Sequence, residues 1–540
     1  MAETPTIRAA DALAQRLYAA GCRHAFGMPG GEVLTLVDAL ESAGIRFILA
    51  KHENAAAFMA EGVYHRTGAP AVLVATVGPG ALNGVNAVAN AHQDRVPMIV
   101  LAGSVDADEA QTYTHQVLDQ QAVFRPITKA SFSMVTGAAH VIADKAVGIA
   151  TEGRPGPVHI DVPISVADAK VSSLKPPYRA SAAATAPTGE ALATARDWFS
   201  NSARAIMVVG VDAMNAGAQT AIAEFVNTFR VPVITTYKAK GMLPEDHALS
   251  LGGAGLSPLA DKHLLPLLAE ADLIIALGYD PIEMRTGWRN AWSPDAQKII
   301  DIAAEPNHHY MHQSSLNIIG DCAASLNAIT ADQEARAMWQ DGHVARTQQA
   351  LARAFPVDEV WGPGAVIATC RDNLPRETLA SADSGAHRIL LSQMWPTFEP
   401  RGLVQSSALC TMGCALPLAM GMSLAEPDRP VVSFSGDAGF LMVAGELATA
   451  RELSLKTIFV VFVDASLALI ELKQRSRQLK NAGVDFAEHD FAAIGRGFGG
   501  NGVTVRARAE LETAIANALA ADTFTVIAAV IDRGSYDGRI

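Results

Sequence analysis

The stretch VVSFSGDAGFLMVAGELATA, residues 431–450, decides the fold. An apolar run typical of a buried strand stops at Gly436-Asp437-Ala438-Gly439 and passes at once into an amphipathic helix. Such a turn presents free backbone N–H groups at the positive end of a helix dipole, which favours a bound phosphate. Asp437 then suggests a cation shared with that phosphate. Because Asp and Gly are also the usual turn residues, such a turn taken alone more often has only a structural role.

A second carboxylate follows the next apolar run. In KTIFVVFVDASLALIELKQ, residues 456–474, Asp464 ends a run where a solvent-seeking group is otherwise unfavourable. Ligands of open α/β sheets lie at the carboxyl ends of strands, where both aspartates fall. The pattern therefore predicts that Asp437 and Asp464 approach one divalent cation such as Mg²⁺.

Composition and charge exclude several classes of function. The formal net charge of -13, without a Lys/Arg cluster, argues against a nucleic-acid partner. The apolar run TIFVVFV is too short to cross a bilayer, so no membrane partner is expected. Five cysteines lack paired metal spacing, and the N-terminus lacks a signal-peptide pattern, which together predict a reduced, cytoplasmic protein. Small molecules are the expected partners.

The chain alternates short β-branched runs with Ala-rich helical stretches. Runs such as AVLVATV, PMIVLAG, AIMVVG and DLIIALG are typical of parallel sheets covered by helices, so the predicted class is α/β with doubly wound sheets. A stretch rich in Pro, Ser and Ala begins at Ser172, and a polar helical region begins at Ala331. They predict domains at residues 1–172, 190–335 and 355–540.

Several segments together resemble the thiamine diphosphate enzymes of the acetolactate synthase and pyruvate oxidase type. The family signature, Gly-Asp-Gly followed by Asn-Asn or Asp-Asn, is similar to Gly436-Asp437-Ala438 with Asp464, with Ala438 in place of the last Gly. Further similar segments are HAFGMPGGEVLTLVDAL, KHENAAAFMAEGVYHRTGAPAVLVATVGPGALNG, GRPGPVHIDVP, SADSGAHRILL and CTMGCALPLAMG. The catabolic acetolactate synthases look most similar, through THQVLDQQAVFRPITK, LIIALGYDPIE and AGVDFAEHDFAAIGRGFG. The resemblance implies an N-terminal pyrimidine-binding, a central and a C-terminal diphosphate-binding domain.

The resemblance also implies cofactors and site residues. Thiamine diphosphate would be bound with Mg²⁺, held by Asp437, Asp464 and the backbone carbonyl of Ser466. Glu53, which could otherwise be an ordinary acid at a helix start, would face N1′ of the pyrimidine and promote proton transfer. The remaining implied cofactor contacts are Gly78, Pro79, Gly80, Asn83, His387, Met412, Gly413, Gly436, Ala438 and Gly439.

Two further residues would lie beside the reacting carbon. His115 and Gln116, in THQVLDQQ, are similar to a pair that can bind a substrate carboxylate or carbonyl, although a lone His is more often structural. The active site of the family lies between subunits, which implies a homodimer or homotetramer. The central domain of relatives carries FAD, ADP or nothing, and GYDPIE favours the flavin-free branch.

The resemblance predicts a 2-oxoacid decarboxylating carboligase, a transferase that joins a pyruvate-derived unit to a second 2-oxoacid. The alternative is a decarboxylase or aldehyde lyase on the same scaffold; a flavin-assisted oxidase and a non-catalytic homologue rank lower, the last because of Glu53. DASLALIEL lacks the usual Asn-Gly-Tyr, and ALCTMG lacks the paired glutamines of similar synthases. These departures predict an acceptor pocket lined by apolar side chains, with broad tolerance for oxoacids and aldehydes.

Overall fold

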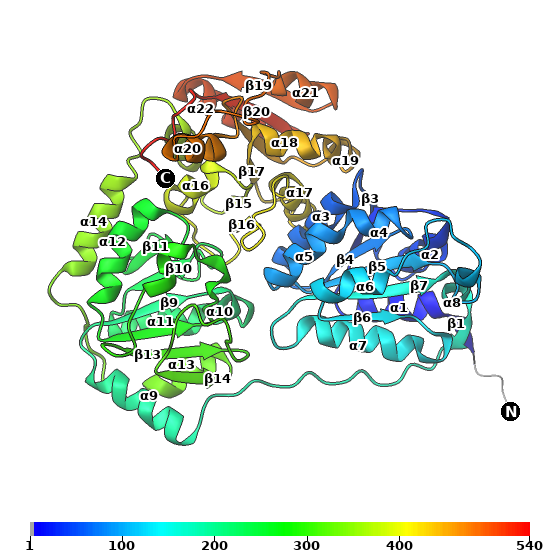
Figure 1. Cartoon of the computed structure of the whole chain (residues 1–540), viewed down its shortest axis with the longest axis horizontal. Helices are drawn as coiled ribbons and strands as arrows, with labels where there is room; N and C mark the ends of the chain where they lie inside the picture. Colours follow the sequence, from blue (N-terminus) through cyan, green and yellow to red (C-terminus); the bar gives the residue numbers. More distant parts are fainter. Residues whose placement is uncertain (1–4) are drawn as a thin grey trace.

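Three six-stranded sheets, all parallel, organise the computed structural model, which describes residues 5–540 (Figure 1). This confirms the predicted α/β class. The N-terminal sheet, in spatial order, consists of β3 (Arg46–Leu49), β2 (His24–Met28), β4 (Ala71–Ala75), β5 (Met98–Ser104), β7 (Pro157–Pro163) and β6 (Ala130–Ser133). Two short antiparallel strands, β1 (Thr6–Arg8) and β8 (Lys170–Ser172), join the two ends of this domain.

The other two sheets repeat this arrangement. The central sheet has the order β11 (Ser250–Ala254), β10 (Val233–Thr236), β9 (Ala205–Val209), β12 (Leu273–Leu277), β13 (Lys298–Ala303) and β14 (Leu316–Ile319). The C-terminal sheet has the order β16 (Leu403–Gln405), β15 (Leu379–Ala382), β17 (Val431–Gly436), β18 (Ile458–Val463), β20 (Thr525–Val530) and β19 (Asn501–Val505). Residues of β9, β12 and β18 are buried throughout, as expected where helices cover both faces.

Helices cover the sheets of all three domains. The N-terminal domain has α1 (Ala9–Ala19), α2 (Leu34–Ser42), α3 (Glu53–Thr67), α4 (Pro79–Asn83), α5 (Val85–Gln93), α6 (Gln120–Phe124), α7 (Ala139–Thr151) and α8 (Ile164–Asp168). The central region has α9 (Gly189–Asn201), α10 (Val211–Asn215), α11 (Gln219–Phe229), α12 (Pro258–Ala269), α13 (Cys322–Thr330) and α14 (His343–Ala354). The C-terminal domain has α15 (Pro363–Asn373), α16 (Ala386–Met394), α17 (Ala415–Ala425), α18 (Asp437–Val443), α19 (Leu447–Glu452), α20 (Ala468–Ser476), α21 (Phe491–Gly497) and α22 (Arg508–Leu519).

The N- and C-terminal domains share one hydrophobic core, because α3 packs directly on α17. Two glycines allow this close approach. A Cβ atom at Gly62 would lie 2.3 Å from the Leu418 carbonyl oxygen, and one at Gly421 would lie 2.0 Å from the Met59 carbonyl oxygen. Any larger side chain there would push the two helices apart.

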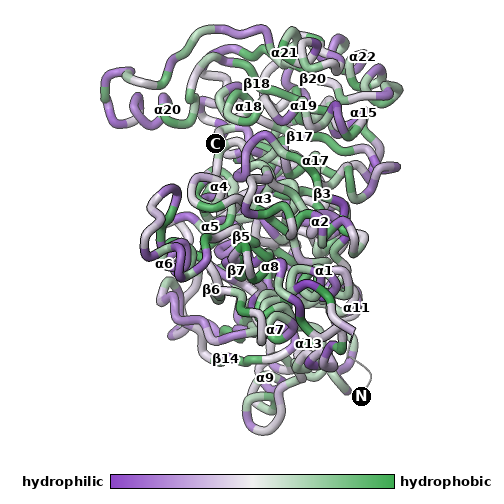
Figure 2. Tube along the Cα trace, turned by 90° about the vertical axis from the view of Figure 1, so that its right-hand side faces the viewer, coloured by the Kyte–Doolittle hydropathy of each residue, from purple (hydrophilic) through white to green (hydrophobic). Residues whose placement is uncertain are grey.

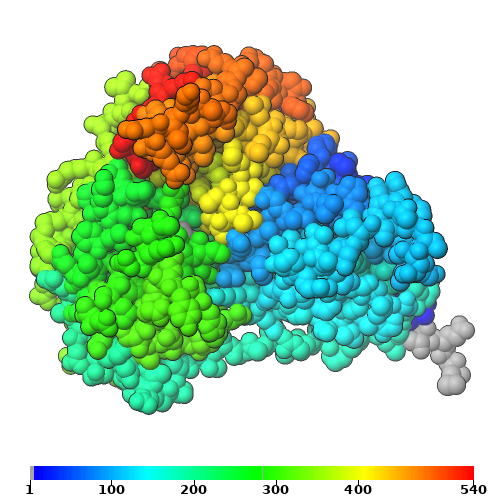
Figure 3. Space-filling model, viewed as in Figure 1, coloured from blue at the N-terminus to red at the C-terminus, as the bar shows by residue number. Residues whose placement is uncertain are grey.

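All three domains meet at a buried ion pair. Lys238, which follows β10, donates a hydrogen bond to Asp94 at 2.9 Å, and both side chains are buried. Asp94 also accepts hydrogen bonds from the backbone N–H groups of Ser407 and Ala408. In Figure 3 the segment near residue 410, drawn in yellow, lies in the hollow where the three lobes meet. The ion pair therefore fixes the chain that enters this segment.

The connections between domains differ in structure. Residues 173–188 contain no helix or strand and run along one side of the molecule from β8 to α9 (Figure 1). The polar region after Ala331 includes α14, which packs on α12 of the central domain. The predicted boundaries at residues 172, 190, 335 and 355 stay predictions.

Hydrophobic residues concentrate in the strands and helices, whereas α20 and the loop after it are largely hydrophilic (Figure 2). All five cysteines are free thiols, and Cys410 alone among them is exposed. Within the part of the chain that the structure describes, no helix has both the length and the apolar character needed to cross a membrane.

Candidate active site

The two predicted carboxylates lie together at the ends of neighbouring strands. β17 and β18 pair in parallel, with Gly436 opposite Phe462, and Asp437 begins α18 directly after β17. Oδ2 of Asp437 accepts hydrogen bonds from the backbone N–H groups of Asp464, at 3.1 Å, and Ala465, at 2.8 Å. The structure therefore brings Asp437 to the turn that carries Asp464, as the sequence predicts.

Both carboxylates are in an environment that disfavours a negative charge. Burial raises the pKa of Asp437 from its ordinary value. Burial, and then the charge of Asp437, raise the pKa of Asp464 to about 7. A cation between the two carboxylates would offset the increase in both pKa values. Carboxylate oxygens are the hard donors that Mg²⁺ prefers. Among the described residues, no group of three or more His, Cys, Asp and Glu side chains could hold a metal.

Asp437 and Asp464 line a cavity of about 320 Å³. One wall consists of the apolar residues 467–470 that follow Ser466, and Tyr536 closes another side. The lining includes eight of the residues proposed from the sequence: His387, Met412, Gly436, Asp437, Ala438, Gly439, Asp464 and Ser466.

His387 presents an unpartnered ring nitrogen in this cavity. It lies in the first turn of α16, is 3% exposed, and stacks on Phe462 with ring centroids 5.3 Å apart. Burial lowers its pKa to about 3, so the ring is neutral. Nε2 of His387 and the hydroxyls of Ser384 and Ser466 have no hydrogen-bond partner, which is unusual for buried polar atoms. A bound diphosphate would supply such partners, so the residues fit that group.

Asp383, which the sequence analysis did not single out, fixes the turn that carries Met412 beside the cavity. It is fully buried and accepts hydrogen bonds from the N–H groups of Ser384, Gly413 and Cys414. A Cβ atom at Gly439 would lie 2.0 Å from Oδ2 of Asp383, so only glycine allows this contact. Asp383 thereby fixes the Met412–Gly413 turn against α18. Its signal in the sequence was a carboxylate directly after the apolar run of β15.

A second cluster of predicted residues surrounds Glu53 in the N-terminal domain. Glu53 begins α3 and is 4% exposed. Its Oε2 accepts a hydrogen bond from Nδ2 of Asn83 at 2.9 Å. Asn83 ends α4, which begins at Pro79, and a Cβ atom at Gly80 would lie 3.0 Å from Oε1 of Glu53. The structure thus places Gly78 and the short helix α4, which together form the Gly78 loop, beside the Glu53 carboxylate.

Gln116 packs against the start of this loop. Gly78 has φ +70°, and a Cβ atom there would lie 2.9 Å from the carbonyl oxygen of Gln116. Gln116 itself has φ +60°, a left-handed conformation that is uncommon for a residue with a side chain. Gln120, which the sequence analysis missed, accepts a hydrogen bond from the Gly78 N–H and donates to Asp161. Gln120 therefore fixes the loop from behind.

The two clusters do not share one cavity. His115 and Gln116 are exposed, and the ring of His115 meets the edge of Tyr113 at 6.2 Å between centroids. Neither these residues nor Glu53 lines the cavity that contains Asp437. One chain therefore presents two half-sites, which we call the carboxylate half-site (Asp383, His387, Asp437, Asp464) and the Glu53 half-site (Glu53, Gly80, Asn83, Gln116).

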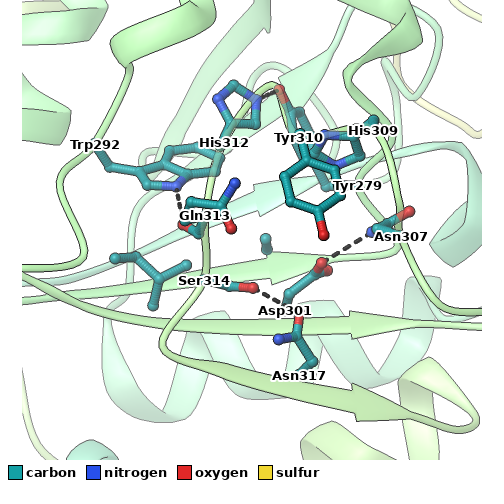
Figure 4. Close-up of a pocket in the computed structure, with 12 residues that line it drawn as sticks. Tyr279, Trp292, Asp301, Asn307, His309, Tyr310, His312, Gln313, Ser314 and Asn317 are labelled. Atoms are coloured by element: carbon teal, nitrogen blue, oxygen red, sulfur yellow. Dashed lines mark hydrogen bonds between the residues drawn. The ribbon is translucent and has the colours of Figure 1, made fainter.

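The central domain has a separate pocket of about 220 Å³, shown in Figure 4. The Tyr279 hydroxyl and Nε2 of His312 are 2.7 Å apart, and Asn307 donates a hydrogen bond to Asp301 on β13. Burial raises the pKa of Asp301 to about 6 and lowers that of His312 to about 4. The sequence analysis singled out none of these side chains. Asn307 and His312 come from the connection between β13 and β14, which has no periodic signal, whereas Tyr279 follows β12 and Asp301 lies within β13.

Comparison with known proteins places this geometry in a family. Three models of thiamine pyrophosphate enzymes match consecutive parts of the chain: the N-terminal TPP binding domain at residues 7–123, the central domain at 192–329 and the C-terminal TPP binding domain at 383–529. The matches contain Glu53 and Asp437 in the two binding domains, one in each half-site.

Whole-chain relatives have consistent names. Acetolactate synthase isozyme 1 large subunit of Escherichia coli is 34% identical, with 89% of this chain and 86% of the relative aligned. Acetolactate synthase of Bacillus subtilis is 29% identical, with 97% and 93% aligned. The catabolic acetolactate synthase of Raoultella terrigena is 28% identical, with 97% and 95% aligned.

Proposed function

We propose a function from the premise that this chain belongs to the thiamine pyrophosphate enzymes, within their acetolactate synthase-like group. It is an enzyme whose first and last domains are TPP binding domains. The proposed reaction joins a two-carbon unit from pyruvate to a second 2-oxoacid. The observation that carries the proposal is the pair of half-sites: two carboxylates at strand ends beside a cavity, and a buried Glu53 beside the Gly78 loop.

The proposed reaction conserves atoms and charge in a simple way. The bond between the carbonyl carbon and the carboxylate of pyruvate breaks, and CO₂ leaves. The electron pair forms a new bond to the carbonyl carbon of the acceptor, whose oxygen takes a proton. Thiamine diphosphate supplies the electron sink that makes this possible.

The carboxylate half-site would hold the cation and the diphosphate. Asp437, Asp464 and the backbone carbonyl of Ser466 would bind Mg²⁺. Nε2 of His387 and the backbone around Gly436, Ala438 and Gly439 would bind diphosphate oxygens. Met412 and Gly413 would support the cofactor from the turn that Asp383 fixes.

The Glu53 half-site would handle protons. Glu53 would share a proton with the ring nitrogen N1′ of the pyrimidine, which is general acid–base catalysis. Asn83 orients the carboxylate through its hydrogen bond to Oε2, and Gly78, Pro79 and Gly80 leave room for the ring beside it. Gln116 and His115 would bind the substrate carbonyl or carboxylate.

We also propose that the two half-sites join between two copies of the chain, in a homodimer or homotetramer. Apolar side chains near both half-sites support this. Leu82, beside Asn83, is 46% exposed, and Met442, on α18, is 66% exposed. Exposed apolar side chains beside a functional site are compatible with burial in an interface. The domains would be those at residues 1–172, 190–335 and 355–540, the central one without FAD, in a cytoplasmic protein.

Product analysis tests the proposal. The purified protein is incubated with pyruvate, thiamine diphosphate and Mg²⁺, and the products are separated and identified. The expected products are CO₂ and an acetolactate-type acid. Acetaldehyde as the sole organic product, or acetate formed with consumption of O₂, would overturn the carboligase proposal.

A further inference from the structure

Two arginines line the cavity that contains the carboxylates. Arg388, the residue after His387 on α16, is 3% exposed. Its Nη1 donates to the Ser406 carbonyl at 2.5 Å and its Nη2 to Sγ of Cys410 at 3.0 Å, while Nε has no partner. Arg285 comes from the central domain, is partly buried and lines the same cavity. The cavity wall is therefore cationic as well as apolar.

Neither guanidinium has a carboxylate partner among the side chains that the structure describes, where ion pairs reach to 4.0 Å. By contrast, Arg154 is paired with Asp212 at 2.9 Å. Burial lowers the pKa of Arg285, and the charge of Arg388 lowers it further. The positive charge of a buried guanidinium is costly when no anion compensates it, so the two side chains are set up for an anion that comes from outside the chain.

The contacts of Arg388 direct it away from the diphosphate end. Its two hydrogen bonds go to Ser406 and Cys410, in the segment that leads to Met412, and not to the turn at residues 436–439. Arg285, Arg388 and Cys410 therefore belong to the end of the cavity at which the substrate would react.

We propose that Arg285 and Arg388 select an acceptor that carries two carboxylates, a 2-oxo dicarboxylic acid. This inference rests on the proposed carboligase function. The carboxylate of pyruvate becomes neutral CO₂, so an ion pair with it would stabilise the ground state and slow its loss. The guanidiniums instead suit carboxylates that persist in the product. A single carboxylate would leave one of the two charges uncompensated in the cavity, whereas two carboxylates match both.

The proposal changes the expected substrate range. The sequence predicted an apolar pocket that tolerates aldehydes, and residues 467–470 do form an apolar wall. The two guanidiniums add a preference for charge, so neutral acceptors should react least. Lys473, exposed at the edge of the cavity, adds a third positive charge that attracts such an acceptor.

The test compares three acceptors with pyruvate as donor: 2-oxoglutarate, 2-oxobutyrate and propanal. For the unchanged enzyme, kcat/KM should fall in that order. Arg285→Gln should lower kcat/KM for 2-oxoglutarate by about 10- to 100-fold and leave that for propanal within about threefold. Arg285→Lys should retain part of the preference, and Arg388→Gln should act in the same direction as Arg285→Gln. Arg289→Gln, an exposed arginine on the next turn, is the control that should change nothing.

Three results would overturn the inference. One is a preference for 2-oxobutyrate over 2-oxoglutarate that Arg285→Gln leaves unchanged. Another is weaker thiamine diphosphate binding in Arg285→Gln, measured by calorimetry, with unchanged acceptor ratios, because the arginines would then hold the diphosphate. Failure of the unchanged enzyme to release CO₂ from pyruvate would overturn the proposed function itself, and the inference with it.

Discussion

The carboxylate half-site and the Glu53 half-site differ in how far one chain completes them. Asp383, His387 and Asp437 are buried, and backbone N–H groups fix both aspartates. In the Glu53 half-site, Glu53 is buried, but Gln116, which lies against Gly78, is exposed and in a left-handed conformation. One half-site is thus built by the sheet that carries it, whereas the other still presents its substrate-facing residues to solvent.

The difference follows from where each group stands in the fold. Parallel strands end at one edge of a sheet, so residues directly after them are gathered without help from another chain. Loop residues such as Gln116 gain fixed surroundings only when something packs on them. We therefore expect changes in the carboxylate half-site to alter cofactor binding, and changes in the Glu53 half-site to alter turnover.

The largest effect is expected for Glu53→Gln. The amide can still accept a hydrogen bond from Asn83, so the fold should persist, but it cannot share a proton with the pyrimidine. Turnover should fall by about 10²- to 10⁴-fold with cofactor affinity much less affected. Steady-state rates, exchange of the C2 proton of the cofactor and calorimetry measure the three quantities. Glu109→Gln, an exposed change in the same domain, should leave them unaltered; C2 exchange at the normal rate in Glu53→Gln would remove Glu53 from the mechanism.

Asp437→Ala should instead abolish most cofactor binding. It removes a cation ligand and the acceptor of two backbone N–H groups, so the affinity for thiamine diphosphate with Mg²⁺ should fall by about 100-fold or more. Asp464→Asn, which keeps an oxygen ligand, should lose about tenfold at most. Chelation of Mg²⁺ from the unchanged enzyme should imitate Asp437→Ala. Titrations that show equal affinity for Asp437→Ala and the unchanged chain would contradict the cation site.

Sequence alone could predict the carboxylate half-site because its logic is local. An apolar run, a turn and a carboxylate occur within a few residues. The parallel pairing of β17 and β18 then brings Asp437 and Asp464 to the same edge of the sheet. Asp383 follows the same rule and could have been found by it. The three sheets were predictable for the same reason, since a run of β-branched residues in the sequence indicates each buried strand.

Contacts between distant segments could not be predicted this way. Arg285 reaches the cavity from the central domain, more than a hundred residues from Arg388. Gln120 holds Gly78 across a loop, and its role depends on the course of that loop. Such contacts arise from domain packing, which leaves no periodic trace in the sequence. The apolar side chains of DASLALIEL therefore form only one wall of the cavity, and the sequence did not predict the arginines that also line it.

The α3–α17 contact joins the two half-sites, and Gly421→Ala should weaken it. The new Cβ atom would lie 2.0 Å from the Met59 carbonyl oxygen, and such overpacking costs about 1–3 kcal/mol. The midpoint of thermal unfolding should fall, with turnover and cofactor affinity reduced together because both half-sites shift. Gly137→Ala, where the added atom meets nothing within 4 Å, is the matched control. An unchanged midpoint in Gly421→Ala would mean that the two helices can separate freely.

Gln116 should give the smallest effect and the sharpest distinction between the half-sites. A neutral hydrogen bond to substrate is worth about 0.5–1.5 kcal/mol, so Gln116→Ala should slow carboligation by about tenfold at most. Glutamine already holds the left-handed backbone at φ +60°, so alanine adds little strain, whereas Gln116→Gly removes the strain. If the side chain matters, both variants lose the same rate; if only the backbone matters, Gln116→Ala keeps the rate and Gln116→Gly alone changes it. Rates at saturating pyruvate with varied acceptor, together with calorimetry of thiamine diphosphate binding, separate these cases. Gln111→Ala is the exposed control. A loss of cofactor affinity equal to the loss of rate would place Gln116 with the carboxylate half-site and break the division between the two.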